Sequence, residues 1–207
     1  MTGAPTSIDG IMRAAPVIPV LVLEEEMDWA RLAATFVEAG LPVLEITLRT
    51  PLALDAIRAI SKVDGAIVGA GTVLNEFQLA RAIEAGSQFI VSPGLTNPLA
   101  LAARDTAIPF LPGVATAADI MRGLDLGLDR FKFFPAEASG GIPALKALSG
   151  PFADVRFCPT GGIRPETAAD WLALEAVLCV GGTWFVKPGD DFDAIGERAR
   201  AAAAFAN

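Results

Sequence analysis

Short apolar segments alternate with amphipathic segments along the whole of this 207-residue chain. The apolar segments begin near eight positions: Val17, Val43, Ala66, Phe89, Ile108, Arg130, Val155 and Ala176. Their starts lie about 23 residues apart, which leaves room for one strand, one helix and two short loops per unit. Eight such units, uninterrupted by any linker, predict a TIM (β/α)8 barrel, α/β class, as a single domain over residues 1–207, with an open doubly wound sheet as the competing fold.

Helix signals accompany the amphipathic segments. In residues 28–39 the apolar side chains fall on one helical stripe, and Gly40 follows as a C-terminal stop. Thr50 stands before Pro51, which predicts a helix that starts there with the Thr50 hydroxyl as its cap.

The charge and the apolar runs exclude several classes of partner. Sixteen basic residues against 24 acidic ones give a net charge of −8, which argues against nucleic acid, although a local basic pocket for an anionic metabolite stays open. The apolar run over residues 14–23 contains Pro16 and Pro19, so it predicts a buried strand and neither a signal peptide nor a membrane span. We expect a cytoplasmic protein in which Cys158 and Cys179 are buried, reduced thiols.

The chain contains no histidine and no tyrosine. Ser-His-Asp and Cys-His catalysis and the usual zinc and iron sites all need an imidazole, so we predict no metal site. The groups left to carry protons are carboxylates, lysine amines, thiols and bound water.

Lys132 lies in an unusual place for a charge, within the apolar segment FKFFP. The other three lysines, Lys62, Lys146 and Lys187, lie in helical or loop contexts. Burial disfavours the charged form of an amine, and a neutral amine can attack a carbonyl to form a Schiff base.

Side chains alternate between the two faces of a strand, and this alternation predicts which way the Lys132 side chain points. The larger apolar set of residues 43–48 should face the helices, which turns Glu45 into the barrel, and the same parity turns Lys132 inward while Phe131 and Phe133 face outward. Glu45 and Lys132 could form a structural ion pair. The catalytic reading is favoured, because buried pairs often fail to recover their desolvation cost, whereas carbinolamine chemistry needs an amine beside a carboxylate.

Glycine pairs follow the last two strands, at Gly161-Gly162 and Gly181-Gly182. The corresponding loops of TIM barrels commonly bind phosphate through backbone N–H groups, although such pairs also mark ordinary turns. Arg49, beyond the second strand, could clamp a carboxylate bidentately, which is the favoured reading, or merely cap a helix or pair with a surface acid.

Several motifs resemble those of one family. The segments are VLEITLRT (43–50), GAGTV (69–73), SPG (92–94), FKFFPAE (131–137) and CPTGGI (158–163), and they resemble the class I 2-keto-3-deoxy-6-phosphogluconate (KDPG) aldolases. The resemblance implies a homotrimeric barrel of the Entner-Doudoroff pathway that needs no cofactor. It would cleave the phosphorylated keto acid to pyruvate and glyceraldehyde 3-phosphate, and related members act on 4-hydroxy-2-oxoglutarate.

The resemblance also implies roles for individual residues. Lys132 matches the Schiff-base lysine, Glu45 the general acid/base, and Arg49 and Thr72 the groups that hold the pyruvate carboxylate. The remaining matches are Pro93 and Phe134 as pocket walls, Thr160 as a hydroxyl contact that helps stereochemical choice, and Gly161, Gly162, Gly181, Gly182 and Thr183 around the phosphate. Thr183 departs from the serine expected there, and its extra methyl could tighten the phosphate pocket. Glu137 belongs to the same motif, but its spacing from Lys132 suits a role at the start of a helix as well as a role in the site.

Two rival functions stay open. A phosphosugar isomerase or epimerase would use Glu45 as a base and form no covalent adduct on Lys132. A non-catalytic phosphometabolite-binding barrel would tolerate the loss of either side chain.

Overall fold

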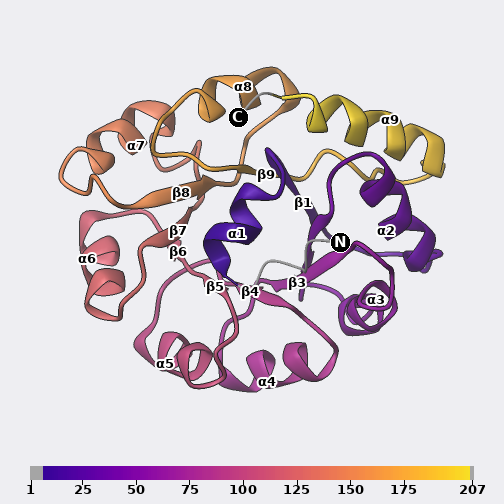
Figure 1. Cartoon of the computed structure of the whole chain (residues 1–207), viewed down its shortest axis with the longest axis horizontal. Coiled ribbons are helices and arrows are strands. Elements are labelled where there is room, and N and C mark those ends of the chain that lie inside the picture. Colours follow the sequence, from indigo (N-terminus) through magenta and orange to yellow (C-terminus); the bar gives the residue numbers. More distant parts are fainter. Residues whose placement is uncertain (1–6, 206–207) are drawn as a thin grey trace.

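The computed structural model describes residues 7–205. The strands are β1 (Val17–Leu21), β2 (Val43–Thr47), β3 (Ile67–Gly71), β4 (Phe89–Val91), β5 (Phe110–Leu111), β6 (Gly113–Val114), β7 (Arg130–Phe133), β8 (Arg156–Pro159) and β9 (Val180–Gly182). The helices are α1 (Ile8–Arg13), α2 (Trp29–Glu38), α3 (Ala53–Ile60), α4 (Glu76–Glu84), α5 (Asn97–Asp105), α6 (Ala117–Asp125), α7 (Gly141–Ser149), α8 (Pro165–Leu172) and α9 (Phe192–Ala203). Helices α2 to α9 surround the strands (Figure 1).

The strands close into a parallel barrel. One sheet has the order β5-β4-β3-β2-β1-β9 and another the order β6-β7-β8. Isolated parallel bridges join the β8 and β9 segments, from Phe157 in β8 to Val177 before β9 and from Thr160 after β8 to Gly181 in β9. Pro112 alone separates β5 from β6. The TIM barrel prediction is confirmed. The fifth predicted strand is divided in two, because Pro112 has no N–H to donate to the ladder.

The two faces of the strands pack as the sequence parity predicts. Val43, Phe89 and Cys158 belong to a small cluster inside the barrel, whereas Leu44 and Phe131 belong to the large layer between strands and helices. Both cysteines are free and buried, as expected. A hydrogen bond with Cys158, together with burial, raises the pKa of the Cys179 thiol well above its ordinary value.

The helix predicted over residues 28–39 is present as α2, whereas the helix start predicted at Thr50 is not. Asp28 caps α2 by accepting a hydrogen bond from the backbone N–H of Arg31 at 2.9 Å. The prediction for Thr50 was wrong, since α3 begins only at Ala53 and the Thr50 hydroxyl makes no hydrogen bond. A tight turn over residues 48–52 comes first, in which the Arg49 N–H donates to the Thr47 carbonyl at 2.8 Å. No helix within residues 7–205 is long and apolar enough to span a membrane.

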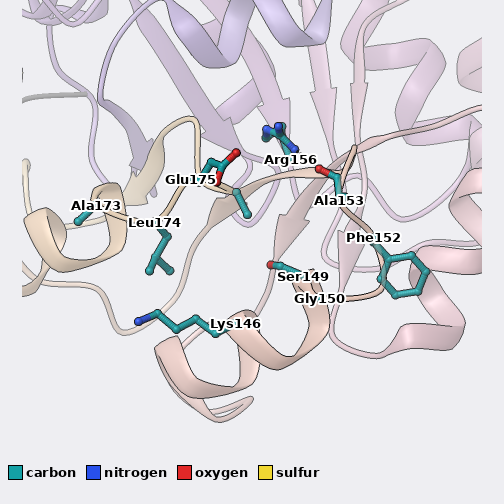
Figure 2. A pocket seen from close by; sticks show the side chains of 10 residues that line it. Lys146, Ser149, Gly150, Phe152, Ala153, Arg156, Ala173, Leu174 and Glu175 are labelled. Atoms are coloured by element: carbon teal, nitrogen blue, oxygen red, sulfur yellow. Dashed lines mark hydrogen bonds between the residues drawn. The ribbon is translucent and has the colours of Figure 1, made fainter.

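A pocket of about 500 Å³ lies at the amino-terminal ends of β8 and β9 (Figure 2). Its lining includes Lys146 near the end of α7, Arg156 at the start of β8, and Glu175 in the loop before β9. Lys132 lies near the carboxyl end of β7, so this pocket is at the opposite end of the barrel.

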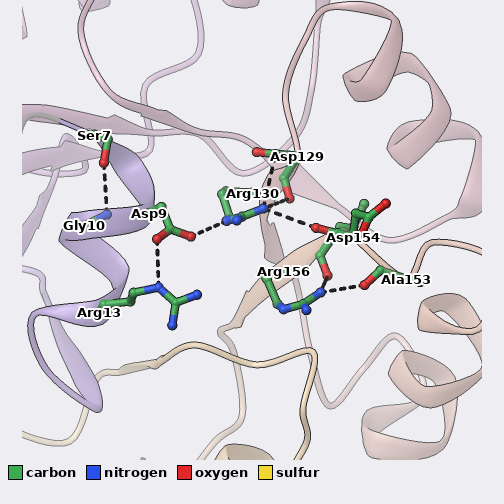
Figure 3. Close-up of polar contacts among 10 residues, drawn as sticks. Ser7, Asp9, Gly10, Arg13, Asp129, Arg130, Ala153, Asp154 and Arg156 are labelled. Carbon is green, nitrogen blue, oxygen red and sulfur yellow. Dashed lines mark hydrogen bonds and ion pairs between the residues drawn. The ribbon is translucent and has the colours of Figure 1, made fainter.

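Helix α1, which the sequence did not reveal, closes that same amino-terminal end. Its Ile11 and Met12 are fully buried in the interior cluster, beside residues at the starts of the strands such as Val43. Asp9 accepts hydrogen bonds from Arg13 at 2.7 Å and from Arg130 of β7 at 2.6 Å (Figure 3). Partial burial by itself would raise the pKa of Asp9, but the hydrogen bonds from the two arginines outweigh it and the pKa is lowered.

We predict that Asp9→Asn destabilises the protein in a pH-dependent way. Because the folded-state pKa of Asp9 is lowered, the carboxylate stabilises the fold above its ordinary pKa, and this contribution is lost as the pH falls through the folded-state pKa. Since Asp9 is about one-third exposed, we expect a loss of about 1 kcal/mol at pH 7. Urea unfolding between pH 7 and pH 3 measures it, with exposed Asp64→Asn as the control. A difference independent of pH would contradict the electrostatic explanation.

Candidate active site

A lysine and a glutamate meet inside the barrel. The Lys132 ammonium of β7 donates hydrogen bonds to the Glu45 carboxylate of β2, at 3.1 Å to Oε1 and 3.4 Å to Oε2. The side chains are only 7% and 4% exposed. Two buried opposite charges compensate each other, and the short separation lets a proton pass between amine and carboxylate.

The strand backbone and one ring hold the lysine. The Lys132 N–H donates to the Pro112 carbonyl at 2.9 Å, so β7 stays in register beside the divided strand. The Lys132 amine also lies 5.2 Å from the centre of the Phe134 ring, a cation–π contact. The structure brings Lys132 and Glu45 together inside the barrel, as the strand parity predicts, and places the Phe134 ring beside the amine. Their roles in a reaction stay predictions.

Gly71 provides the space for the glutamate, a role that sequence reasoning missed. It is the last residue of β3, and a Cβ added there would lie 2.2 Å from Glu45 Oε1 and 2.7 Å from Cγ. The signal in the sequence was a glycine at the end of the strand next to the one that carries Glu45. Any side chain at position 71 would displace Glu45 from Lys132.

Arg49 and Thr72 lie on the rim where β2 and β3 end. The N–H of Leu48 donates to the Gly71 carbonyl at 2.8 Å, which joins the two segments beyond the strands. Thr72 has φ 58°, a left-handed conformation that is strained for a β-branched residue. Such strain concentrates at functional sites. Arg49 is exposed on this rim.

Thr160 follows β8 and is 3% exposed. Gly181 on the neighbouring β9 leaves room for it, because an added Cβ would lie 2.3 Å from the Thr160 hydroxyl oxygen. The sequence placed Gly181 and Gly182 in a loop, but both lie within β9, where they continue the strand ladder. The loop begins at Thr183, which is exposed.

The remaining predicted residues line the same end of the barrel. Gly161 and Gly162 have φ 102° and 82°, a region that favours glycine. A Cβ on Gly161 would lie 3.3 Å from the Phe134 ring. Pro93, after β4, approaches β6 so closely that a Cβ on Gly113 would lie 2.2 Å from the Pro93 carbonyl oxygen. Residues 7–205 contain no group of three or more His, Cys, Asp or Glu side chains that could hold a metal ion.

A TIM barrel with a buried amine and carboxylate near the carboxyl ends of its strands has the construction of a class I aldolase, which acts through a Schiff base. The model of the family "KDPG and KHG aldolase" matches residues 8–197. A KHG/KDPG aldolase of Escherichia coli is 54% identical over 203 residues, with 95% of each chain covered.

Solved structures agree with the family model. The KDPG aldolase of Zymomonas mobilis ZM4, solved with 3-phosphoglycerate, is 56% identical with a TM-score of 0.94 and covers 96% of each chain. The KDPG aldolase of Legionella pneumophila, solved with pyruvate as a covalent carbinolamine intermediate, is 42% identical with a TM-score of 0.90, covering 96% of this chain and 98% of that one. The chain belongs to the KDPG and KHG aldolase family.

We predict that Gly71→Ala lowers stability and disrupts the pair. The added methyl group overlaps the Glu45 carboxylate, and such overpacking costs about 1 to 3 kcal/mol. Urea unfolding measures the loss, and a crystal structure of the variant would reveal a longer distance between Lys132 and Glu45. Gly150→Ala is the matched control, since its nearest contact would be an ordinary 3.6 Å. Equal stability of the two variants would contradict the assigned role of Gly71.

Proposed function

We propose that the protein cleaves 2-keto-3-deoxy-6-phosphogluconate to pyruvate and glyceraldehyde 3-phosphate through a Schiff base on Lys132. The observation that carries the proposal is the buried hydrogen-bonded pair of Lys132 and Glu45. Family membership and the 54–56% identical relatives named for this reaction support the substrate. The name of the Escherichia coli relative, KHG/KDPG aldolase, and a 39% identical structure described as a 4-hydroxy-2-oxoglutarate aldolase support a second substrate, 4-hydroxy-2-oxoglutarate. We also propose that the protein is a cytoplasmic enzyme of the Entner-Doudoroff pathway, which agrees with a phosphorylated substrate.

The geometry suggests how the steps proceed. The Lys132 amine, after passing a proton to Glu45, attacks the C2 carbonyl, and the oxygen takes up protons and leaves as water to give a protonated imine. The C4 hydroxyl then loses its proton, the C3–C4 bond breaks, and its electrons move into the imine to form an enamine. Glyceraldehyde 3-phosphate leaves as the aldehyde. Protonation at C3 and hydrolysis of the imine release pyruvate and restore Lys132. Glu45 is the carboxylate within reach for these proton transfers.

The other residues of the site suggest the orientation in which the substrate binds. Arg49 and Thr72 on the β2–β3 rim would bind the carboxylate beside C2, with Pro93 and Phe134 as walls. Thr160 would contact a substrate hydroxyl. The phosphate would lie at the other side, against Gly161-Gly162, the Gly181-Gly182 strand end and the Thr183 hydroxyl.

Borohydride reduction in the presence of pyruvate tests the covalent step. We expect a pyruvate-sized mass increase on Lys132, located by peptide mass spectrometry, and neither adduct nor turnover in Lys132→Ala. Glu45→Gln should lower kcat by about 10²- to 10⁴-fold, because it removes the proton carrier. Lys146→Ala, on the outer helix α7, is the matched control and should behave as wild type.

The same experiment separates the rival functions. Conversion of one phosphosugar into another, without any adduct on Lys132, would favour a phosphosugar isomerase or epimerase, in which Glu45 abstracts the proton. Aldolase turnover is measured by coupling the release of pyruvate to a dehydrogenase. A wild-type protein that binds phosphorylated ligands without turnover would favour a non-catalytic binder.

We also propose that the protein is a homotrimer, associated through an apolar surface on consecutive outer helices. Five large apolar side chains are exposed on or beside α4, α5 and α6, namely Leu74 (55%), Phe77 (69%), Leu101 (37%), Met121 (58%) and Leu124 (42%). Exposed apolar groups collected on one side of a chain commonly mark an interface, and a second copy of the chain is the natural occupant in a closed ring.

We predict that Phe77→Glu dissociates the oligomer. A carboxylate within an apolar interface must be desolvated, and Arg81, whose guanidinium lies 5.7 Å from the centre of the Phe77 ring, offsets only part of that cost, so association should weaken. Light scattering coupled to size-exclusion chromatography measures the mass, with exposed Lys62→Glu as the control. An unchanged mass of three chains in Phe77→Glu would contradict this choice of surface, and a monomeric wild type would contradict the trimer.

A further inference from the structure

Glu137 lies in the turn between β7 and α7, beside the Gly161-Gly162 segment that follows β8. The N–H of Glu137 donates to the Gly161 carbonyl at 3.0 Å, and the N–H of Ala136 donates to the Thr160 carbonyl at 2.8 Å. The segments after β7 and β8 therefore remain hydrogen-bonded beyond the ends of their strands.

The aliphatic part of Glu137 packs directly on Gly162. A Cβ added to Gly162 would lie 2.7 Å from both Cβ and Cγ of Glu137. Gly162 also has φ 82°, so the turn depends on glycine both for its backbone angle and for this close approach. The Gly161-Gly162 turn cannot move toward Glu137 unless that side chain moves as well.

The carboxylate of Glu137 makes two further contacts. Its Oε1 accepts a hydrogen bond from the indole N–H of Trp171 on α8 at 3.2 Å. Trp171 is fully buried, with its ring 6.3 Å from that of Phe133, so it is a fixed donor. A Cβ built on Gly141 would lie 3.5 Å from Glu137 Oε2. This oxygen therefore faces the first residue of α7.

The position at α7 explains why an acid is suited to this site. The residue before α7 is Gly140, which has no side chain to cap the helix. A carboxylate near the helix amino terminus is stabilised by the helix dipole. The helix-start role considered from the sequence and the contact with Trp171 thus use different oxygens of the same side chain.

We propose that Glu137 is a positioning residue that fixes the Gly161-Gly162 turn for binding of the substrate phosphate. The proposal rests on the function proposed above, in which this turn contacts the phosphate. Glycine-rich backbone is flexible, and holding it in the bound conformation beforehand reduces the entropy lost on binding. Glu137 joins the turn to β7, to α8 and to the start of α7. Within residues 7–205 its side chain makes no hydrogen bond or ion pair with Lys132 or Glu45.

The test compares a phosphate-dependent readout with a phosphate-free one. We expect Glu137→Ala to raise KM for 2-keto-3-deoxy-6-phosphogluconate about 10-fold with kcat changed less than about 2-fold, since preorganisation is lost but the reacting groups are not. The pyruvate concentration that half-saturates borohydride trapping on Lys132 should stay the same, because pyruvate carries no phosphate. Glu137→Gln keeps an acceptor for Trp171 and should retain a KM near wild type.

Trp171→Phe supplies an independent arm, because it removes the donor and keeps an aromatic ring. Its KM should rise, but less than in Glu137→Ala, which also removes the side-chain contacts with Gly162 and α7. The double variant should rise no further than Glu137→Ala, since the hydrogen bond to Trp171 is already lost there. Exposed Glu84→Ala on α4 is the control. Because Glu137 is an exposed residue, its variants should fold and test the proposal even if Trp171→Phe does not fold.

Two results would overturn the proposal. The first is an unchanged KM for the phosphorylated substrate in Glu137→Ala, and the second is an equal loss of pyruvate trapping, which would mean a general disturbance of the site. Failure of wild-type protein to trap pyruvate would overturn the proposed function instead, so the two failures are distinguishable.

Discussion

The ion pair between Lys132 and Glu45 is the interaction around which this barrel is arranged. Two charges with almost no exposure are tolerated only when each compensates the other and the geometry is maintained. Gly71 leaves the space for the carboxylate, and the Pro112 carbonyl holds the lysine backbone in register. The compensation also keeps an amine and a proton carrier together before substrate arrives, which is the requirement of Schiff-base chemistry.

The barrel separates packing from chemistry along its axis. At the amino-terminal end, α1 inserts Ile11 and Met12 among the first residues of the strands, and Asp9 ties the helix to Arg130. The barrel interior at this end is filled by apolar side chains. At the other end, short loops carry the glycines and hydroxyls, and strained backbone occurs there at Thr72. The strands form a rigid scaffold that holds a few side chains accurately, and the loops at the carboxyl ends of the strands can vary around them.

Much of the site could be predicted because strand parity is a local property. Alternation alone turned Glu45 and Lys132 into the same interior, and the structure brings them to 3.1 Å. The contacts that depend on close approach between neighbouring strands could not be predicted in this way. Gly71 against Glu45 and Gly181 against Thr160 join residues that are 26 and 21 positions apart, and they depend on the register between strands.

Composition and periodicity are properties of the chain itself, so they were enough to predict the repeating strand–helix order, the inward direction of the two charges and the exclusion of imidazole chemistry. Three features became visible only in the folded chain: Pro112 divides a strand, α1 closes the barrel, and Glu137 reaches both Trp171 and α7. These features arise from packing between distant segments. Local propensity does not encode the angle and distance at which such segments meet.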